Sequence, residues 1–401
     1  MLGIGDNPEK RLMRNGSATM AHRNTQQKAL WDDHPANEDA TYLSNQLLTY
    51  IGNKRSLLDN IAHAIDRVKH RLGKDRLRVF DVFAGSGVVS RFLKAHASLL
   101  VSNDFEDYAA VVGRCYLRNR STVDFQRLGK IVGDLNARVD TETFPMGFIE
   151  KLYAPKDENH ITAEDRVFYT RDNARRLDNY RRMLDSVPLD AQEMILGPLL
   201  SEASVHANTA GVFKGFYKDS RTGVGKFGGS NGDALLRIRG PIQLAPPILS
   251  RFECDVQVMQ DDANSAARKV SDLDLAYIDP PYNQHPYGSN YFMLNLLVHY
   301  KRPKEVSKVS GIPIDWRRSG YNTKAQSLEL LRDLLHTLDS RFLLVSFNNE
   351  GFIKPDAMMA VLKHLGSVQV LEMQYNTFRG SRNLRGRDIH VTEHLFLVER
   401  K

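Results

Sequence analysis

Hydrophobic and polar positions follow two periods along the chain, and together these periods predict a mixed α/β architecture. From Lys54 to about Leu72 the apolar residues recur at helical spacing, and residues 78–83 form a short β-branched and aromatic run. A glycine-rich turn follows, then a helical stretch over 88–96 and a second strand over 98–102. This part of the chain therefore predicts a strand–turn–helix–strand unit.

Strands and helices alternate again in the last third of the chain. Helices are expected at about 289–300, 325–338 and 355–365, and strands at 254–259, 274–278, 341–346, 368–374 and 392–398. Because strands that alternate with helices form mainly parallel sheets, we expect such a sheet with helices on both faces. A basic loop without helical period joins the last two strands, so these could pair as an antiparallel hairpin.

Two regions depart from this alternation and suggest the domain organisation. Residues 1–38 are polar and lack a sustained apolar period, which predicts a mobile N-terminal extension. Residues 115–250 contain Arg-rich helical segments and then a glycine-rich, basic and aromatic stretch. We therefore expect one α/β domain formed by residues 39–114 and 251–401, interrupted by a mostly helical insert over 115–250.

The composition supports a soluble globular chain. It has 401 residues, of which 42% are hydrophobic and 26% charged. No apolar run approaches the roughly 18–20 residues that span a bilayer, so no membrane partner is expected. The N-terminus mixes charges into its apolar residues and makes a poor secretory signal. Two cysteines, Cys115 and Cys254, cannot form a disulfide framework, which favours a reducing cytoplasm.

The net charge of +7 is unevenly distributed. Three segments are basic: residues 205–240 carry +4, 301–325 carry +5 and 376–390 carry +3, so the rest of the chain is slightly acidic. Clustered positive charge favours a polyanionic partner, because each neutralised phosphate releases counterions. For any single segment the alternative is a solvated basic loop.

The run from Asp81 to Gly87 is the first candidate for chemistry. Its glycines allow a ligand to approach the backbone closely, and the helix that follows favours polar or negative groups at its N-terminus. Asp104 ends the next strand, where it can accept hydrogen bonds from ribose hydroxyls. Ser90 replaces the third glycine of a dinucleotide fingerprint, so the pattern fits a nucleoside-containing cofactor in general. A tight turn without a ligand is the alternative.

The tetrapeptide Asp279-Pro280-Pro281-Tyr282 is the second candidate, and it follows an apolar strand directly. Two prolines cannot extend a sheet ladder, so Asp279 must stand at the carboxyl edge of the sheet, where α/β proteins bind ligands. A carboxylate, an unpaired Pro280 carbonyl and an aromatic ring together suit a planar base with an exocyclic amine. The alternative, a proline turn with a capping Asp, leaves the glycine turn and the basic segments unexplained.

From about Leu48 to Val398 the chain resembles the Dam-type, alpha-class DNA N6-adenine methyltransferases. Residues 83–87 resemble the glycine loop of that family, and residues 279–282 match its catalytic DPPY tetrapeptide. The resemblance implies a Rossmann-like fold that uses S-adenosylmethionine and no metal, with residues 115–250 as the target-recognition region. It also implies double-stranded DNA as the partner, and a restriction-modification methylase with a possible cognate endonuclease in a bacterial or phage-encoded setting.

The resemblance implies a role for each matching residue. The catalytic residues are Asp279, Pro280, Pro281 and Tyr282. The cofactor-binding residues are Tyr50, Lys54, Asp81, Phe83, Ala84, Gly85, Ser86, Gly87, Asp104 and Asp262, with Asp261 as a rival to Asp262. The expected DNA contacts, which rest on the basic segments, are Lys214, Lys218, Arg221, Lys226, Arg379 and Arg382.

In the implied mechanism, Asp279 and the Pro280 carbonyl accept both amine hydrogens of a flipped adenine, and Tyr282 stacks on its ring. Tyr291 either lines this pocket or belongs to the core. One alternative keeps the fold but changes the acceptor, to cytosine N4 or to an adenine of ribosomal RNA. A second is a non-catalytic DNA-specificity subunit.

Overall fold

The computed structural model describes residues 38–229, 232–348, 351–376 and 390–401. The predicted N-terminal extension, apart from its last residue, lies outside the described residues.

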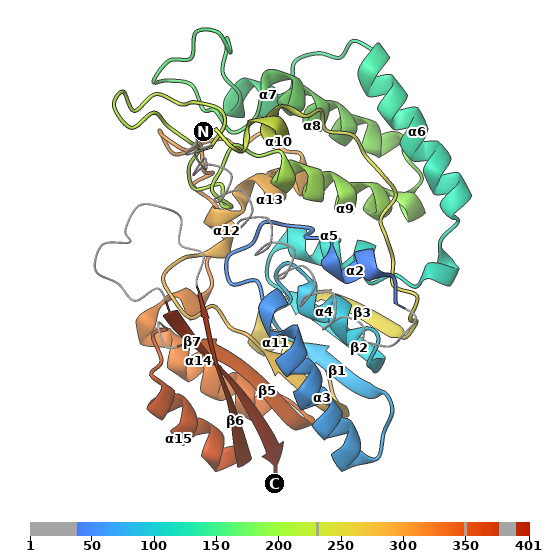
Figure 1. Ribbon diagram of the computed structural model, residues 1–401, viewed down its shortest axis with the longest axis vertical. Helices are drawn as coiled ribbons and strands as arrows, with labels where there is room; N and C mark the ends of the chain where they lie inside the picture. Colours follow the sequence, from blue (N-terminus) through green and yellow to red (C-terminus); the bar gives the residue numbers. More distant parts are fainter. Residues whose placement is uncertain (1–37, 230–231, 349–350, 377–389) are drawn as a thin grey trace, which may run out of the picture.

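A seven-stranded sheet occupies the lower part of the molecule in Figure 1, in the order β3-β2-β1-β4-β5-β7-β6. The strands are β1 Leu77–Asp81, β2 Ala97–Asp104, β3 Asp255–Gln260, β4 Leu273–Ile278, β5 Ser340–Asn348, β6 Gly366–Asn376 and β7 His390–Arg400. Neighbouring strands are parallel except that β7 runs antiparallel to both β5 and β6. The predicted mainly parallel sheet with a C-terminal antiparallel hairpin is confirmed.

Helices cover both faces of this sheet because alternate residues of each strand point to opposite sides. On one face, Phe80 and Ile278 pack among α11, α14 and α15. On the other, Val79 and Leu275 pack among α2, α3 and α4. The bounds are α2 Ala40–Ser44, α3 Leu58–Leu72, α4 Val88–Leu93, α11 Ala263–Ala267, α14 Lys324–Thr337 and α15 Pro355–Leu365.

A helical layer lies above the sheet in Figure 1 and has a core of its own. Its helices are α5 Asp107–Tyr116, α6 Phe125–Thr141, α7 Phe148–Tyr153, α8 Arg171–Met183, α9 Leu189–Val205, α10 Leu235–Arg239, α12 Tyr287–Asn290 and α13 Phe292–His299. The core joins residues of α5 and α13, such as Val112 and Phe292, to α6, α8 and α9. The helices of residues 115–250 are therefore packed on α5, which follows β2, and on α13, which follows β4 and α12.

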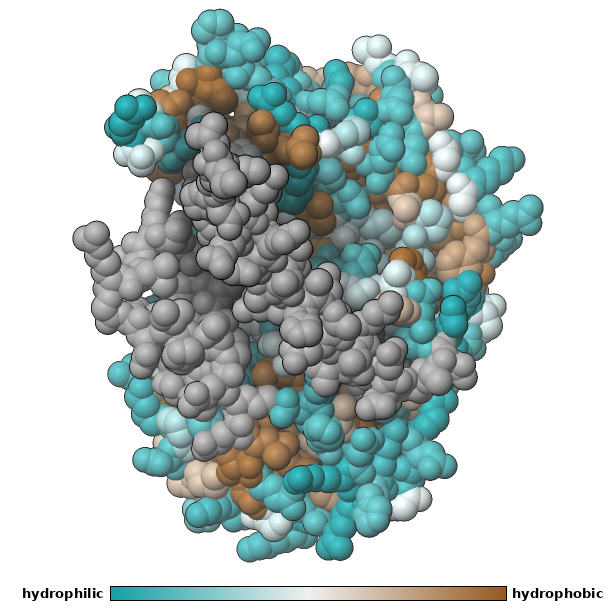
Figure 2. All heavy atoms as spheres, viewed as in Figure 1, coloured by the Kyte–Doolittle hydropathy of each residue, from teal (hydrophilic) through white to brown (hydrophobic). Residues whose placement is uncertain are grey.

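On the face shown in Figure 2, hydrophilic side chains cover most of the described surface. The order of the strands then determines where a ligand can bind. The chain moves outward from β1 to β2 and β3, and returns to the other side of β1 with β4. Such a reversal leaves a crevice at the carboxyl ends of the two central strands, the usual ligand site of an open α/β sheet.

Candidate active site

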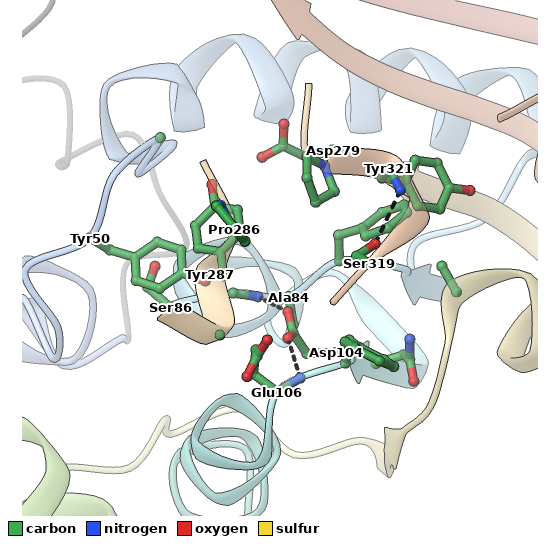
Figure 3. A pocket seen from close by; sticks show the side chains of 18 of the residues that line it. Tyr50, Ala84, Ser86, Asp104, Glu106, Asp279, Pro286, Tyr287, Ser319 and Tyr321 are labelled. Atoms are coloured by element: carbon green, nitrogen blue, oxygen red, sulfur yellow. Dashed lines mark hydrogen bonds between the residues drawn. The ribbon is translucent and has the colours of Figure 1, made fainter. Parts of the chain in front are cut away.

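A cavity opens at this crevice and encloses about 860 Å³ of space free of protein atoms, part of it open to solvent. It is lined by ten of the residues that the sequence nominated: Tyr50, Lys54, Phe83, Ala84, Gly85, Ser86, Asp104, Asp262, Asp279 and Pro281. Figure 3 shows Asp279 on one side of the cavity, and Asp104 with Glu106 on the other.

The glycine turn after β1 forms the floor beside Tyr50. Gly85 adopts φ +54°, and its amide donates a 2.7 Å hydrogen bond to Oδ2 of Asp104. A Cβ at Gly85 would lie 2.9 Å from Cε1 of Tyr50. Both the left-handed backbone and the close approach of the ring therefore require glycine here.

Two acidic side chains lie at the carboxyl end of β2, Asp104 as its last residue and Glu106 just after it. Asp104 also accepts a 2.9 Å hydrogen bond from the Glu106 amide, yet burial raises the pKa of its carboxyl. Burial likewise raises the pKa of Glu106 to about 7, and Asn295 donates to this carboxyl at 2.7 Å. Glu106 was not predicted from the sequence, although an acid two residues after Asp104 was a usable signal.

Tyr50 is held in a stack of tyrosines. Its ring lies 5.1 Å from that of Tyr287 and 4.6 Å from that of Tyr291, nearly parallel to both, and its hydroxyl is 3.0 Å from that of Tyr108. Tyr291 is fully buried, and its hydroxyl accepts a 2.7 Å hydrogen bond from the Ile51 amide. Tyr291 thus packs against Tyr50 as a buried residue. Of the two roles that the sequence left open for Tyr291, it has the one in the core.

The carboxylate of Asp279 lies at the end of β4, as the proline argument required. Its Oδ1 is 3.0 Å from the ammonium of Lys54, and this ammonium is also 3.1 Å from Oε1 of Glu393 on β7. Burial is the main cause that raises the pKa of Asp279 to about 6, against the opposing effect of Lys54. Glu393 was missed, although a carboxylate inside an apolar strand was a signal.

The backbone after Asp279 also agrees with the sequence argument. Among the described residues, no hydrogen bond is directed to the Pro280 carbonyl oxygen. Tyr282 lies beside the cavity with its ring 5.7 Å from that of Phe347, and the Lys54 ammonium is 5.5 Å from the Tyr282 centroid.

Three other residues that were predicted to bind the cofactor make structural contacts. Asp81 is fully buried below the glycine turn, where it accepts a 2.6 Å hydrogen bond from Ser90, and burial raises its pKa to about 7. Gly87, at φ +75°, precedes the first residue of α4. Asp262 lines the cavity, but its carboxylate caps α11 by accepting from the amides of Asn264 and Ser265.

The basic stretch after α9 forms a hairpin over residues 217–226. The Lys226 amide donates to the Tyr217 carbonyl at 2.9 Å, and Asp219 accepts from the Arg221 amide at the exposed tip. Lys218 lies over the ring of Phe216, 5.1 Å from its centroid.

The chain before the hairpin joins it to the active-site helix. The Phe213 amide donates to the Asn290 carbonyl of α12 at 2.7 Å, and Lys214 is exposed beside this junction. Of the nominated DNA contacts, Lys214, Lys218, Arg221 and Lys226 thus lie within one segment. Arg379 and Arg382 lie outside the described residues.

Across residues 38–229, 232–348, 351–376 and 390–401, no three His, Cys, Asp or Glu side chains gather as a metal site. No helix within those ranges has the length and apolar character needed to cross a bilayer.

Comparison with known proteins identifies the family. The chain is 25% identical over 361 residues to the type II methyltransferase M.NlaIII of Neisseria lactamica, which covers 88% of this chain and 99% of that protein. It is 27% identical over 354 residues to the type II methyltransferase M.CviAII of Paramecium bursaria Chlorella virus 1, and this match covers 87% of this chain and 97% of that protein. It is also 27% identical over 376 residues to the modification methylase StsI of Streptococcus sanguinis, covering 88% of this chain and 52% of that protein. The family model of the D12 class N6 adenine-specific DNA methyltransferases matches residues 50–360, so the chain belongs to this family and is an adenine-specific DNA methyltransferase.

Proposed function

We propose that the cavity binds S-adenosylmethionine and presents it to an adenine held by Asp279. The observation that carries this proposal is the shared cavity: Asp279 at the end of β4 faces the same space as the glycine turn and Asp104. A nucleoside cofactor and a base amine can therefore meet at one place. Bound there, S-adenosylmethionine supplies an electrophilic methyl group.

The charge of the cavity fits a sulfonium cofactor. Five carboxyl side chains and two cations line it, and both cations are already paired with acidic residues, Arg317 with Asp107 and Lys54 with Asp279 and Glu393. A surplus of carboxylates favours a positively charged guest.

The nucleoside part of the cofactor matches the other features of the cavity. Asp104 offers carboxylate oxygens for ribose hydroxyls, and Phe83 packs edge-on against Tyr321 at 5.2 Å to form an apolar wall. Tyr50, Ser86 and the turn amides border the remaining space. We also assign Asp262 to this site because it lines the wall of the cavity. Its carboxylate itself caps α11.

The chain's own groups then act on the adenine amine. The lone pair of that amine is delocalised into the ring, which makes it a weak nucleophile. Asp279 and the Pro280 carbonyl accept the two amine hydrogens and localise the lone pair outside the ring, and Tyr282 stacks on the extruded base. Positioning and electrostatic placement supply most of the rate enhancement in such a site.

We further propose that residues 115–250 recognise duplex DNA and that the hairpin over 217–226 contacts it. The exposed tip at Arg221 and the junction of Phe213 with α12 support this assignment, because they connect a basic element to the active site. Cationic side chains here neutralise phosphates and read base edges. By analogy with its relatives, the protein serves a restriction-modification system beside a cognate endonuclease, in the cytoplasm of a bacterium or of a virus-infected cell.

The decisive experiment is incubation with methyl-labelled S-adenosylmethionine and duplex DNA, followed by nucleoside analysis. We expect the label in N6-methyladenine with wild-type protein and none with Asp279→Ala. Label in N4-methylcytosine, or in RNA alone, would reassign the acceptor. Methylation that survives in Asp279→Ala would remove this carboxylate from the reaction.

A further inference from the structure

The ammonium of Lys54, from the N-terminal part of the chain, is shared between the partly buried carboxylate of Asp279 and the buried carboxylate of Glu393. Its exposed side-chain fraction is 4%, that of Asp279 is 15% and that of Glu393 is 0%. The distances of 3.0 Å to Asp279 and 3.1 Å to Glu393 are nearly equal, and the Gly52 carbonyl accepts from the same ammonium at 3.3 Å. Three oxygen atoms therefore lie close to an ammonium that is almost entirely removed from water.

We propose that Lys54 and Glu393 are positioning residues that set the ionisation and orientation of the Asp279 carboxylate. This inference rests on the proposed role of Asp279 as acceptor of an amine hydrogen. Lys54 holds Oδ1 of Asp279, which leaves Oδ2 for the adenine amine. Neither Lys54 nor Glu393 needs to touch the base.

Glu393 is essential to this arrangement because of the charge balance. A lone Lys54–Asp279 pair would be neutral, and an acceptor neutralised in this way binds an amine hydrogen less strongly. Glu393 compensates the ammonium, so the group of three carries one net negative charge when ionised. An isolated buried carboxylate would instead protonate, since removing charge from water is costly.

The fold holds Glu393 in place independently of the substrate. It pairs with Asn348 of β5 and Met373 of β6 on the two sides of β7, and Ser346 donates a 2.9 Å hydrogen bond to its Oε1. The strand that enters antiparallel between β5 and β6 thus delivers a carboxylate to the ammonium of Lys54. This gives the C-terminal hairpin a catalytic purpose besides completing the sheet.

Other groups also face Asp279. Tyr277 precedes it on β4 and pairs in register with Asp81, and burial raises the pKa of both side chains. Tyr287, whose pKa burial also raises, faces Asp279 from α12, and Tyr282 in the following turn has its ring centroid 5.5 Å from the Lys54 ammonium. These groups are the same in every variant below, so they cancel when pH profiles are compared.

Two substitutions should move the acid limb of the pH–rate profile of methylation in opposite directions. This limb is the pH range in which the rate falls as the solution becomes more acidic. Glu393→Gln removes a repulsive charge but keeps the size of the side chain, so the Asp279 pKa falls and the limb moves to lower pH by about one unit. Lys54→Met removes the attractive charge, so the limb moves to higher pH by about one unit or more.

The measurement is the single-turnover methylation rate of duplex DNA across about pH 5 to 9, because this rate reports the chemical step. Wild-type protein should show an acid limb near the Asp279 pKa of about 6. Glu399→Gln is the matched control, since Glu399 lies on the same strand and pairs with Arg71 at the surface. Its limb should coincide with that of wild type.

A purely structural role predicts lower rates at every pH with an unmoved limb, and that result would overturn the inference. If Lys54→Met does not fold, Glu393→Gln decides alone, since an unmoved limb in this variant also overturns it. The proposed function fails separately, if wild-type protein places no label on adenine. Calorimetric titration of Glu393→Gln with S-adenosylmethionine checks that the cavity remains intact, because Lys54 lines the cavity and Glu393 is not among its lining residues.

Discussion

Gly85→Ala perturbs the glycine turn at the point where backbone and side chain meet. At φ +54° an L-residue is in the left-handed region, which costs about 1–2 kcal/mol. The new methyl would also lie 2.9 Å from Cε1 and 3.2 Å from the hydroxyl of Tyr50. Because the rings of Tyr287 and Tyr291 both pack against Tyr50, its ring cannot move aside without disturbing these contacts.

Gly73→Ala provides a matched control. Gly73 ends α3 at φ +64°, and a Cβ there meets no atom within 4 Å. The two substitutions therefore share the strain of the backbone and differ in the contact with Tyr50. For a chain of 401 residues, 1–2 kcal/mol lowers the melting temperature by only about 1–3 °C.

The assay is calorimetric titration with S-adenosylmethionine beside thermal unfolding of each variant. We expect Gly73→Ala to bind S-adenosylmethionine like wild type. Gly85→Ala should bind it about tenfold more weakly or worse, since each 1.4 kcal/mol of lost binding free energy is a factor of ten in affinity. The amide of residue 85 must also keep its hydrogen bond to Asp104. Equal affinity in the two variants would refute the assignment of this turn to the cofactor.

Three further predictions follow from the site and its surroundings. Asp279→Asn should reduce methylation by about 10²–10³-fold, because the amide loses an acceptor oxygen but fills the same space. Calorimetry should show that S-adenosylmethionine still binds. Loss of both methylation and cofactor binding would contradict a role of Asp279 confined to the adenine amine. Burial raises the Asp81 pKa from 3.8 to about 7, so the folded protein holds a proton that the unfolded chain has lost, and stability falls as pH rises through this window. Asp81→Asn should therefore gain melting temperature over wild type at about pH 8 but little at about pH 4, and an equal gain at both would be inconsistent with that pKa. Neutralising Lys214, Lys218 and Arg221 together should weaken duplex binding and flatten its salt dependence by up to about three units of slope, whereas Lys363→Ala on α15 should not; an unchanged slope would place the hairpin outside the interface.

Much of the fold was predictable because periodicity and chain breakers act locally. The helix expected at 355–365 is α15 with the same bounds, and its proline at the first position explains why it begins there. The alternation of strands and helices predicted the parallel sheet, since such connections leave few topologies. The basic loop before β7 predicted the antiparallel hairpin, although not that β7 would enter between β5 and β6.

The candidate site was predictable where a residue's role follows from its neighbours in sequence. Two prolines after Asp279 end β4 and leave its carboxylate at the sheet edge, and Gly85 allows the turn that approaches Tyr50. Asp81 shows the limit of this reasoning. It belongs to the same motif, yet strand alternation turns its carboxylate toward Ser90, below the cavity.

Tertiary structure alone decided which charges meet. Lys54, Asp279 and Glu393 come from three distant parts of the chain. No local sequence pattern predicts that the carboxylates of Asp279 and Glu393 lie within 3.1 Å of the Lys54 ammonium. The sequence by itself determined the elements, the order of the motifs and the edge at which Asp279 stands, because these depend on backbone preferences of adjacent residues. The environment of that carboxylate depends on burial and on strand order, which exist only after β7 has paired with β5.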